Sequence, residues 1–438
     1  MTPGGRHQAS IDLADAILGS PRPADGIAAA WFRARRYIGA KDRKVIHERV
    51  YAILRRRARL TWWLEREGAR PDARALLLAE LAFAEQPVPE KLALDFDGPP
   101  HHPDELSRAE RRLVAVLGRA TLESPEMPDW VRLEYPEWLD GPLRAVLGEG
   151  LESEMAALLR PAPLDLRVNR LKADRAQAQA ALAEEGTAAQ ETPLSPVGLR
   201  LASRINLMVT RAFKEGLVEI QDEGSQIAAL LVGAKPGMAV IDLCAGAGGK
   251  TLALAAQMAN KGRLVAADVS EGRLFRSGDR LRRAGIDNVE RRVIGQAGDK
   301  WLKRSAGRFD RVLVDAPCTG TGTWRRNPDA KWKLTPTDLA ELAAKQAAIL
   351  DRAAKLVRPG GRLIYVTCSL LAEENEAQIE SFQARFADFA PLPIERAWAE
   401  ALPGVACPGK GPWLRLSPAR HGTDGFFIAL LERAQSPE

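Results

Sequence analysis

Residues 239–251 read AVIDLCAGAGGKT, an apolar run followed by a glycine-rich turn. The run predicts a β-strand, and the turn leads into a predicted helix. Gly246, Gly248 and Gly249 let the backbone bend tightly and come close to a ligand at the carboxyl end of a sheet. The stretch therefore predicts an α/β fold with a ligand site at this strand-turn-helix unit.

Apolar runs alternate with helical stretches in the rest of the chain. Near-continuous runs of this kind are typical of a parallel sheet covered by helices on both faces. The runs are RLVAADVS at 263–270, VERRVIG at 289–295, FDRVLVDAPC at 309–318 and GRLIYVTCS at 361–369, with GFFIALLER at 425–433 as a candidate closing strand. We therefore predict a Rossmann-like domain, with a mostly parallel doubly wound sheet, over residues 221–438.

The first part of the chain has a helical pattern. Within residues 8–90, apolar side chains recur at helical spacing on one face, and arginines occupy the other. The apolar positions are Ile46, Val50, Ile53, Leu54, Leu60 and Leu64. Five prolines within residues 87–103 predict a loop or linker. An all-helical domain is therefore expected over residues 1–140.

A small α/β module is expected between these two domains, over residues 141–220. Residues 164–171 alternate like a strand, and residues 174–186 have the pattern of a helix closed by Gly186. Three domains agree with the length of 438 residues.

Composition narrows the cellular setting. Apolar residues make up 46% of the chain and charged residues 27%, an ordinary globular balance. No run approaches the roughly 18 apolar residues of a membrane-spanning helix, and the N-terminus lacks the layout of a signal peptide. We therefore expect a cytoplasmic protein with no membrane partner.

The four cysteines stand at 244, 318, 368 and 407. No metal site or disulfide framework is predicted, because there is no CxxC spacing and no matching histidine pair.

Charge is segregated along the chain, although the net charge is only +6. Residues 33–59 hold 11 basic and 2 acidic side chains, residues 72–160 hold 9 and 18, and residues 273–333 hold 16 and 7. The two basic regions predict contact with phosphate, and a solvated basic face is the alternative. The last region offers a dense basic run, Arg325, Arg326, Lys331 and Lys333, and two candidate stacking surfaces, Trp324 and Trp332. Packing in the core is the alternative, and the commoner role, for the two tryptophans.

Three kinds of nucleotide site compete for the glycine-rich turn. A dinucleotide site would need a third glycine where Thr251 stands. A P-loop would end in Gly249-Lys250-Thr251, but Cys244 replaces its first glycine; with Asp315 as the acidic residue of a metal-binding strand, an NTPase is a rival. An S-adenosylmethionine site needs an acidic residue at the end of the next strand to accept hydrogen bonds from ribose hydroxyls, and Asp268 stands there.

Cys318 and Cys368 end two of the predicted strands, and both ends lie on the ligand edge of a doubly wound sheet. A single cysteine at such a place is ordinarily a buried, inert residue. Two of them beside a methyl-donor turn fit a reaction at carbon 5 of a pyrimidine, which becomes nucleophilic only after a thiolate adds to carbon 6. Lys250 could favour the thiolate, and Asp315 could hydrogen-bond the protonated ring nitrogen 3 and neutralise the charge that develops on addition. The base must be flipped out or single-stranded, and the residues alone leave open which cysteine attacks.

Six motifs resemble those of the Sun/RsmB family of RNA (cytosine-5) methyltransferases. They are RVNRLKA at 167–173, QDEGSQIAA at 221–229, DLCAGAGGKT at 242–251, DAPCTGTGTWRRNPDAKW at 315–332, TCSLLAEENE at 367–376 and DGFFIALL at 424–431. They occur in the family's order and spacing. IGAKDRKVIHERVYAILRR at 38–56 is similar to the NusB-like RNA-binding domain of bacterial members that act on small-subunit ribosomal RNA.

The resemblance implies roles for the matching residues. Cys368 would be the nucleophile, Cys318 would assist release, and Asp315 would line the site of the base. The cofactor, S-adenosyl-L-methionine, would be contacted by Cys244, Ala245, Gly246, Ala247, Gly248, Gly249, Lys250, Asp268, Gln296 and Asp315. The sequence departs from the family in two places: Gly246-Ala247 stand where Ala-Pro is usual, and Gln296 stands where an acidic residue is usual.

These observations predict an S-adenosylmethionine-dependent enzyme that methylates carbon 5 of a cytosine in RNA. Ribosomal RNA is the expected substrate, and the enzyme is expected to be a monomer. Two alternatives remain open: a transfer-RNA methyltransferase of the same chemistry, and a non-catalytic RNA-binding assembly factor that keeps the fold.

Overall fold

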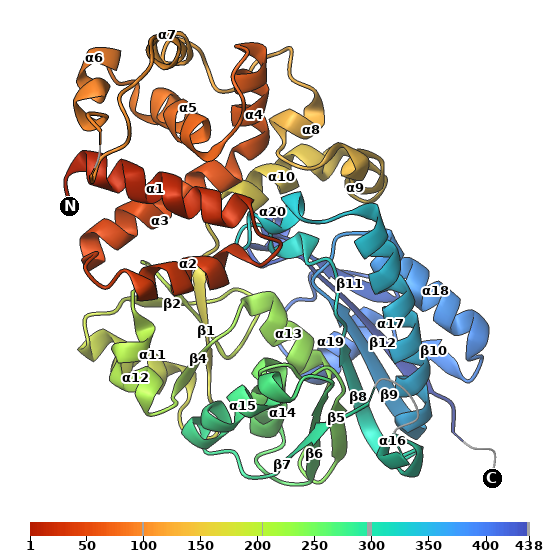
Figure 1. Cartoon of the computed structure of the whole chain (residues 1–438). Helices are drawn as coiled ribbons and strands as arrows, with labels where there is room; N and C mark the ends of the chain where they lie inside the picture. Colours follow the sequence, from red (N-terminus) through yellow and green to blue (C-terminus); the bar gives the residue numbers. More distant parts are fainter. Residues whose placement is uncertain (99, 204, 296–299, 436–438) are drawn as a thin grey trace. The chain divides into compact units, whose positions relative to one another are not determined.

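The structure, a computed structural model, describes residues 1–98, 100–203, 205–295 and 300–435 (Figure 1). Its contacts divide the chain into two compact units. One unit comprises Met1–Arg160 and Trp324–Leu334, and the other comprises Pro161–Thr323 and Thr335–Glu438. Residues 141–160 pack with the first unit. The division into three domains, over 1–140, 141–220 and 221–438, stays a prediction.

The first unit is built from helices. Their starts carry capping groups: the Asp72 carboxylate accepts the Ala75 N–H, and Ser107 and Glu110 form a capping box. The elements are α1 (Pro3–Leu18), α2 (Ala24–Ala34), α3 (Ala40–Arg55), α4 (Arg57–Arg66), α5 (Ala73–Glu85), α6 (Pro89–Leu92), α7 (Arg108–Leu117), α8 (Asp129–Arg132), α9 (Asp140–Leu147), α10 (Leu151–Leu159) and the 3-10 turns η1 (Ala93–Asp95), η2 (Glu137–Leu139), η3 (Gly148–Gly150) and η6 (Ala330–Trp332). The helical pattern predicted for residues 8–90 is confirmed.

The predicted apolar helix face lies in the core of this unit. All six of its side chains are buried, four on α3 and two on α4: Ile46, Val50, Ile53, Leu54, Leu60 and Leu64. One of the arginines between them, Arg59, is buried as well, and its guanidinium Nε lies 2.9 Å from the Glu134 carboxylate. The loop predicted over 87–103 is wrong in part, because α6 and η1 form there and Leu92 and Phe96 join the core.

The segment Trp324–Leu334 packs with the first unit, although its neighbours in the chain, Thr323 and Thr335, belong to the second. The Asp329 carboxylate accepts the Ala24 N–H at 2.9 Å, and the Trp332 indole N–H donates to the Leu54 carbonyl at 3.3 Å. Both partners are in the first unit's helical region. The segment is therefore anchored at the start of α2 and at the end of α3.

This packing corrects the exposed basic surface that was expected in the segment. Trp324, Arg325 and Lys331 are buried. The Lys331 ammonium lies 5.8 Å and 5.2 Å from the ring centroids of Trp324 and Trp332, so aromatic rings take the place of solvent around it. The expectation of phosphate contacts is wrong at Arg325 and Lys331, whereas the burial of Trp324 agrees with core packing, the alternative given for the tryptophans.

The second unit begins with a small antiparallel sheet of order β2-β3-β1-β4. Its strands are β1 (Leu164–Val168), β2 (Ala189–Glu191), β3 (Gly198–Leu201) and β4 (Val218–Ile220), accompanied by α11 (Arg175–Glu184), η4 (Leu207–Val209) and α12 (Arg211–Lys214). Asp174 and Gln177 form a capping box at the start of α11. The strand predicted at 164–171 and the helix predicted at 174–186 are both present.

The large sheet has the order β10-β12-β9-β8-β5-β6-β7, with β11 paired to β12. Its strands are β5 (Ala239–Asp242), β6 (Arg263–Asp268), β7 (Val289–Val293), β8 (Phe309–Asp315), β9 (Val357–Thr367), β10 (Phe389–Pro391), β11 (Trp413–Leu416) and β12 (Phe426–Arg433). The pairs among β5 to β9 are parallel, and β10, β11 and β12 add antiparallel pairs. The predicted α/β fold with a Rossmann-like, mostly parallel sheet is confirmed, and so is the strand at 425–433.

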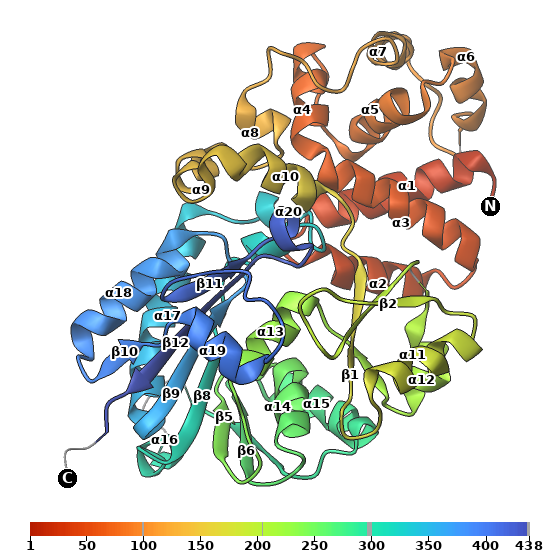
Figure 2. The ribbon, with the colours of Figure 1, turned by 180° about the vertical axis from the view of Figure 1, so that it is seen from behind.

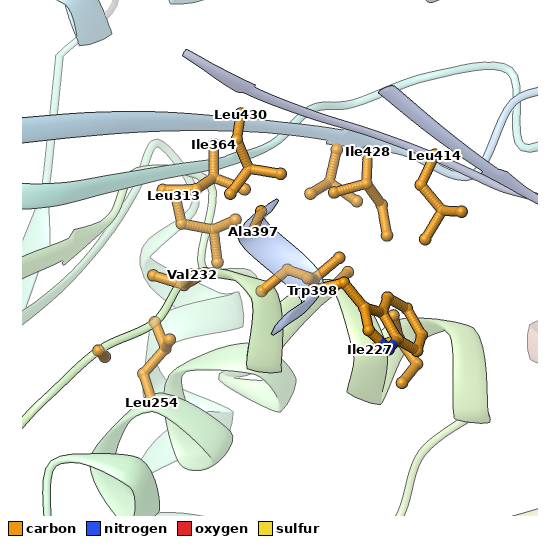
Figure 3. Close-up of a cluster of buried hydrophobic side chains, with 14 of the residues drawn as sticks. Ile227, Val232, Leu254, Leu313, Ile364, Ala397, Trp398, Leu414, Ile428 and Leu430 are labelled. Atoms are coloured by element: carbon orange, nitrogen blue, oxygen red, sulfur yellow. The ribbon is translucent and has the colours of Figure 1, made fainter. Parts of the chain in front are cut away.

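Helices cover both faces of the large sheet (Figure 2). The helices of this part of the chain are α13 (Glu223–Leu231), α14 (Gly249–Gln257), α15 (Glu271–Ala284), α16 (Lys300–Arg304), α17 (Pro336–Leu356), α18 (Glu376–Arg385), α19 (Ile394–Ala401) and α20 (Pro418–His421), with the turns η5 (Thr321–Thr323) and η7 (Ala372–Glu374). On one face Ile227 of α13 and Trp398 of α19 pack with Leu313 and Ile364 of the sheet (Figure 3). On the other face α17 and α18 pack with β8 and β9.

The order of the strands places a ligand site. From β5 the chain runs outward to β6 and β7, and it then returns to β8 on the other side of β5. The carboxyl end of β5 is therefore a topological switch point, where open α/β sheets bind ligands. Among the described residues, no helix is both long enough and apolar enough to span a bilayer.

Candidate active site

A cavity of about 950 Å³ lies at the carboxyl edge of the large sheet. The turn after β5 supplies residues 244–247, Gly249 and Lys250 to its lining, and Asp268 and Asp315 come from the last positions of β6 and β8. The cavity is therefore at the switch point, beside the glycine-rich turn.

The glycine-rich turn faces the open space of the cavity. Gly246 has φ +55° and Gly248 has φ +84°, values that favour glycine over residues with a side chain. A Cβ atom placed on Gly246 would meet no atom within 4 Å, whereas one on Gly248 would lie 3.0 Å from the Cβ of Ser277. The replacement of Ala-Pro by Gly246-Ala247 thus gives a turn whose first glycine has a left-handed φ and leaves room for a ligand.

The Asp268 carboxylate is buried and held by the backbone. Its Oδ2 accepts the Gly246 N–H at 2.8 Å, and its Oδ1 accepts the Ser270 N–H at 2.7 Å. A carboxylate oxygen has two lone pairs, so each oxygen can accept one more hydrogen bond from a ligand hydroxyl. Asp268 is therefore preorganised to receive a diol.

Two arginines that the sequence interpretation did not assign support the turn from other elements. The Arg167 guanidinium, on β1, donates to the Gly249 carbonyl at 2.8 Å, and that of Arg280, on α15, donates to the Ala247 carbonyl at 2.7 Å. Burial lowers the pKa of Arg167 to about 10, which leaves it charged at neutral pH. Its signal in the sequence was the motif RVNRLKA, which had no function attached to it.

Lys250 and Asp315 meet at the cavity. The Lys250 ammonium lies 2.7 Å from Asp315 Oδ2 and 5.4 Å from the ring centroid of Phe426. Among the described residues, the ion-pair partner of Lys250 is this carboxylate and not a thiol. Any effect of Lys250 on the two cysteines is therefore indirect, through its ion pair with Asp315.

The structure brings Cys318 and Cys368 together. Their Sγ atoms are 3.5 Å apart, and the Cys368 carbonyl accepts the Gly322 N–H at 2.9 Å. The hydrogen bond with Cys368, together with burial, raises the pKa of the Cys318 thiol well above its usual range. The expected lowering of a thiol pKa therefore does not occur at Cys318.

The two remaining cysteines and Gln296 differ in their places. Cys244 lines the cavity, but burial and the nearby charges of Asp242 and Asp315 raise the pKa of its thiol, so it stays neutral. Cys407 packs against the apolar core. Gln296 lies outside the described residues.

Known proteins match this chain over most of its length. Residues 229–432 match 16S rRNA methyltransferase RsmB/F, and residues 135–208 match the RsmF/B-like ferredoxin-like domain. Ribosomal RNA small subunit methyltransferase B of Xanthomonas campestris is 34% identical over 402 residues, which are 90% of this chain and 90% of that protein. The chain belongs to the RsmB/F methyltransferase family. The probable ribosomal RNA small subunit methyltransferase B of Synechocystis is 30% identical to this RsmB/F protein over 413 residues, 90% and 92% of the two chains.

Solved structures agree with the assignment. A crystal structure of PH0851 covers 99% of this RsmB/F chain and 100% of its own, at 28% identity and a TM-score of 0.78. That of a methyltransferase homologue from Pyrococcus horikoshii covers 71% and 100%, at 32% identity and a TM-score of 0.59. The predicted membership of the Sun/RsmB family is confirmed.

S-adenosylmethionine is the cofactor of this RsmB/F methyltransferase. The donor set fits it. The open side of Gly246 leaves space at the turn, Asp268 retains acceptor capacity for ribose hydroxyls, and the carboxylates at the cavity suit a cationic ligand. The cavity is also larger than roughly 300 Å³, the lower end of ordinary ligand pockets.

Proposed function

We propose that this chain methylates carbon 5 of a cytosine in small-subunit ribosomal RNA, through a covalent bond between Cys368 and carbon 6. The observation that carries the proposal is the thiol pair, 3.5 Å apart after β8 and β9, with Asp315 three residues before Cys318. Two relatives named for ribosomal RNA small subunit methylation, at 30% and 34% identity, support the choice of substrate.

In the proposed reaction the Cys368 thiolate adds to carbon 6, and the electron pair of the 5,6 double bond moves toward carbon 5 and the ring. Nitrogen 3 takes up a proton from solvent as the charge develops, and the Asp315 carboxylate, held in place by Lys250, accepts the hydrogen bond of this N3–H group. S-adenosylmethionine supplies the methyl group when bound. While Cys368 is bonded to carbon 6, the Cys318 thiol loses its proton to solvent, and the Cys318 thiolate then accepts the proton of carbon 5. The carbon–hydrogen electron pair restores the double bond, Cys368 leaves as a thiolate, and nitrogen 3 returns its proton to solvent.

The cofactor contacts follow the same geometry. We assign the turn 244–250 and Asp268 to the cofactor, because they line or shape the cavity and keep hydrogen-bonding capacity toward it. Asp315 stands where the cofactor and base sites meet. Gln296 remains part of this assignment on the family pattern alone.

The first unit is assigned to RNA, as a domain of the NusB-like kind. Around the turn between α2 and α3, basic side chains are exposed, and Tyr37 is 76% exposed; the basic residues are Arg33, Arg36, Lys41 and Lys44. Such a surface offers phosphate contacts and a ring on which a base can stack. We further propose a cytoplasmic monomer, whose four free cysteines suit a reducing compartment.

A tritium-release assay tests the function. The full chain is mixed with S-adenosylmethionine and RNA that carries tritium at carbon 5 of cytosine. Small-subunit ribosomal RNA should release tritium in step with methyl incorporation, and Cys368→Ser protein should do neither. Methyl incorporation without tritium release would place the methyl group on another atom.

The same assay separates the alternatives. Activity on transfer RNA with none on ribosomal RNA would support the transfer-RNA enzyme instead. Tight binding of ribosomal RNA with no methylation would favour a non-catalytic assembly factor.

A further inference from the structure

Glu374 is a buried carboxylate with no part in the reaction proposed above. It is the last residue of η7, six residues after Cys368, and it is 0% exposed. Burial of a carboxylate is costly unless its oxygens are hydrogen-bonded. A carboxylate in this place therefore needs an explanation from its contacts.

The carboxylate binds the residue that follows Cys318. Glu374 Oε1 accepts the Thr319 N–H at 2.9 Å, and Oε2 accepts the Thr319 hydroxyl. Oε1 also accepts the side-chain amide of Gln346, on α17, at 2.9 Å. Since the Thr319 N–H belongs to the peptide bond between Cys318 and Thr319, Glu374 fixes the backbone of Cys318.

The next residue, Asn375, holds the other cysteine in the same way. Its amide donates to the Ser369 carbonyl at 2.9 Å, and its carbonyl oxygen accepts the Thr367 hydroxyl. Thr367 and Ser369 are the two neighbours of Cys368 in the chain. Two consecutive residues thus hold the two thiols, Glu374 on the side of Cys318 and Asn375 on the side of Cys368.

The two holding residues differ in charge. Asn375 is neutral, whereas the Glu374 donors are a peptide N–H, a hydroxyl and an amide, none of them a cation. In the part of the chain that the structure describes, Glu374 forms no ion pair within 4 Å. Its negative charge therefore acts on its surroundings without a bound counterion, and the thiol nearest to its contacts is Cys318.

We propose that Glu374 is a positioning residue that determines which of the two thiols ionises. The negative carboxylate of Glu374 disfavours a thiolate at Cys318, so the thiolate forms at Cys368. The proton lost from the pair passes from Cys368 to solvent. The proton that remains stays on Cys318 and forms an S–H donor bond to the Cys368 thiolate. The proposal rests on the proposed function for its meaning, since Cys368 is the nucleophile there.

The groups around Cys318 agree with this assignment. Among the described residues, the titratable groups that face it are Cys368 just after β9, Tyr365 within β9 and Glu374 on η7. The hydrogen bond with Cys368, burial, and the charges of Cys368 and Glu374 all raise the pKa of the Cys318 thiol. Lys250, one of the basic residues that line the cavity, is paired with Asp315 and not with Glu374.

Alkylation of each cysteine tests the proposal without RNA or cofactor. The full chain is treated with iodoacetamide over a pH series, and the alkylated fractions of Cys318 and Cys368 are measured by peptide mass spectrometry. Wild-type protein should be alkylated faster at Cys368. In Glu374→Gln protein the ratio of the Cys368 rate to the Cys318 rate should fall by about tenfold, the change that one pKa unit produces in a thiolate fraction.

Two variants separate the effect of the Glu374 charge from other effects of the substitution. Glutamine at 374 can still accept from Thr319 N–H and Gln346, and it can donate to the Thr319 hydroxyl, so the hydrogen bonds survive while the charge is lost. Glu373→Gln is the matched control, because Glu373 lies in the same turn but is exposed, and its ratio should equal that of wild type.

An unchanged ratio in folded Glu374→Gln protein overturns the proposal. Faster alkylation of Cys318 than of Cys368 in wild-type protein overturns it as well, even if the variant does not fold. Because the readout needs no methylation, its failure is distinct from failure of the tritium-release assay.

Discussion

Lys250 and Asp315 form an ion pair of 2.7 Å between the start of α14 and the end of β8. The pair joins the cofactor turn to the segment that carries Cys318. Lys250 is 7% exposed, so the attraction is weakly screened by solvent. This ion pair thus connects the residues proposed to bind the cofactor with the segment that carries Cys318.

Replacement of Lys250 by methionine should remove the charge and keep most of the side-chain volume. We expect methyl incorporation to fall about a hundredfold, because the loss of one electrostatic group at a reacting centre costs about 10²–10³ in rate. Lys261→Met is the control, since Lys261 is exposed in the same unit. Full activity in Lys250→Met protein would show that the ion pair does not assist the reaction.

Arg167→Lys should weaken cofactor binding. A charged hydrogen bond to the Gly249 carbonyl is lost, and such a bond contributes about 1.5 kcal/mol, which is about tenfold in the dissociation constant. Calorimetric titration with S-adenosylhomocysteine measures the change. Arg170→Lys, at an exposed position of the same motif, should bind as wild type does. Equal affinities for the two variants would contradict the supporting role of Arg167.

Asp242 should make stability depend on pH. Burial raises its pKa to about 7; its Oδ2 accepts the Thr251 hydroxyl, and its Oδ1 has no hydrogen-bond donor among the described residues. The pKa of Asp242 in the folded protein lies above the unfolded value of 3.8, so the proton on this carboxyl favours the folded state. Its contribution to the free energy of unfolding is complete below pH 3.8 and is lost as the pH rises toward 7.

Asp242→Asn protein should lack this dependence. Relative to the variant, wild type should lose about 2 to 3 kcal/mol of unfolding free energy between about pH 5 and about pH 8. Urea unfolding at the two pH values measures the difference, in which contributions from all other groups cancel. Parallel pH curves for the two proteins would mean that Asp242 is already ionised at low pH.

Glu134→Gln should destabilise the first unit strongly. Glu134 is 0% exposed, bonds Arg59, and lies near the buried Lys331 of the segment Trp324–Leu334. Removal of one partner from a buried charge cluster costs about 3–5 kcal/mol, whereas Glu126→Gln, which breaks an exposed pair with Arg66, should cost less than about 1 kcal/mol. Urea unfolding compares them, and similar small losses would exclude a structural role for the cluster.

The sequence predicted the large sheet well because its signals are local. β5, β6, β8 and β9 contain buried apolar runs, and the glycines of the turn mark the end of β5. β7, with the sequence VERRV, lacks such a run. The density of charged residues in the sequence was a less reliable guide to which basic residues are exposed. It could not show that Lys331 and Arg325 are buried, since their cover comes from helices about 270 residues earlier in the chain.

The support of the site depends on contacts that no local pattern contains. Arg167 and Glu374 both stand in motifs that were recognised, yet their partners are backbone groups 82 and 55 residues away. A motif shows that such residues match a family, but only the fold shows what they bind. The placement of Cys318 beside Cys368 was foreseeable, because both follow neighbouring parallel strands.

The segment Trp324–Leu334 also changes how the N-terminal region should be tested. Deletion of residues 1–140 would remove the partners of Asp329 and Trp332 and expose Trp324. Loss of activity in such a truncation would not separate RNA binding from folding. Substitutions at exposed residues such as Tyr37 and Arg36 avoid this difficulty.

The covalent adduct tests the central claim most directly. Cys318→Ala protein is mixed with small-subunit ribosomal RNA and S-adenosylmethionine and analysed on a denaturing gel. We predict a protein–RNA adduct that accumulates because release is blocked, and that is absent from Cys318→Ala, Cys368→Ala protein. An adduct that persists without Cys368 would contradict the assignment of the nucleophile.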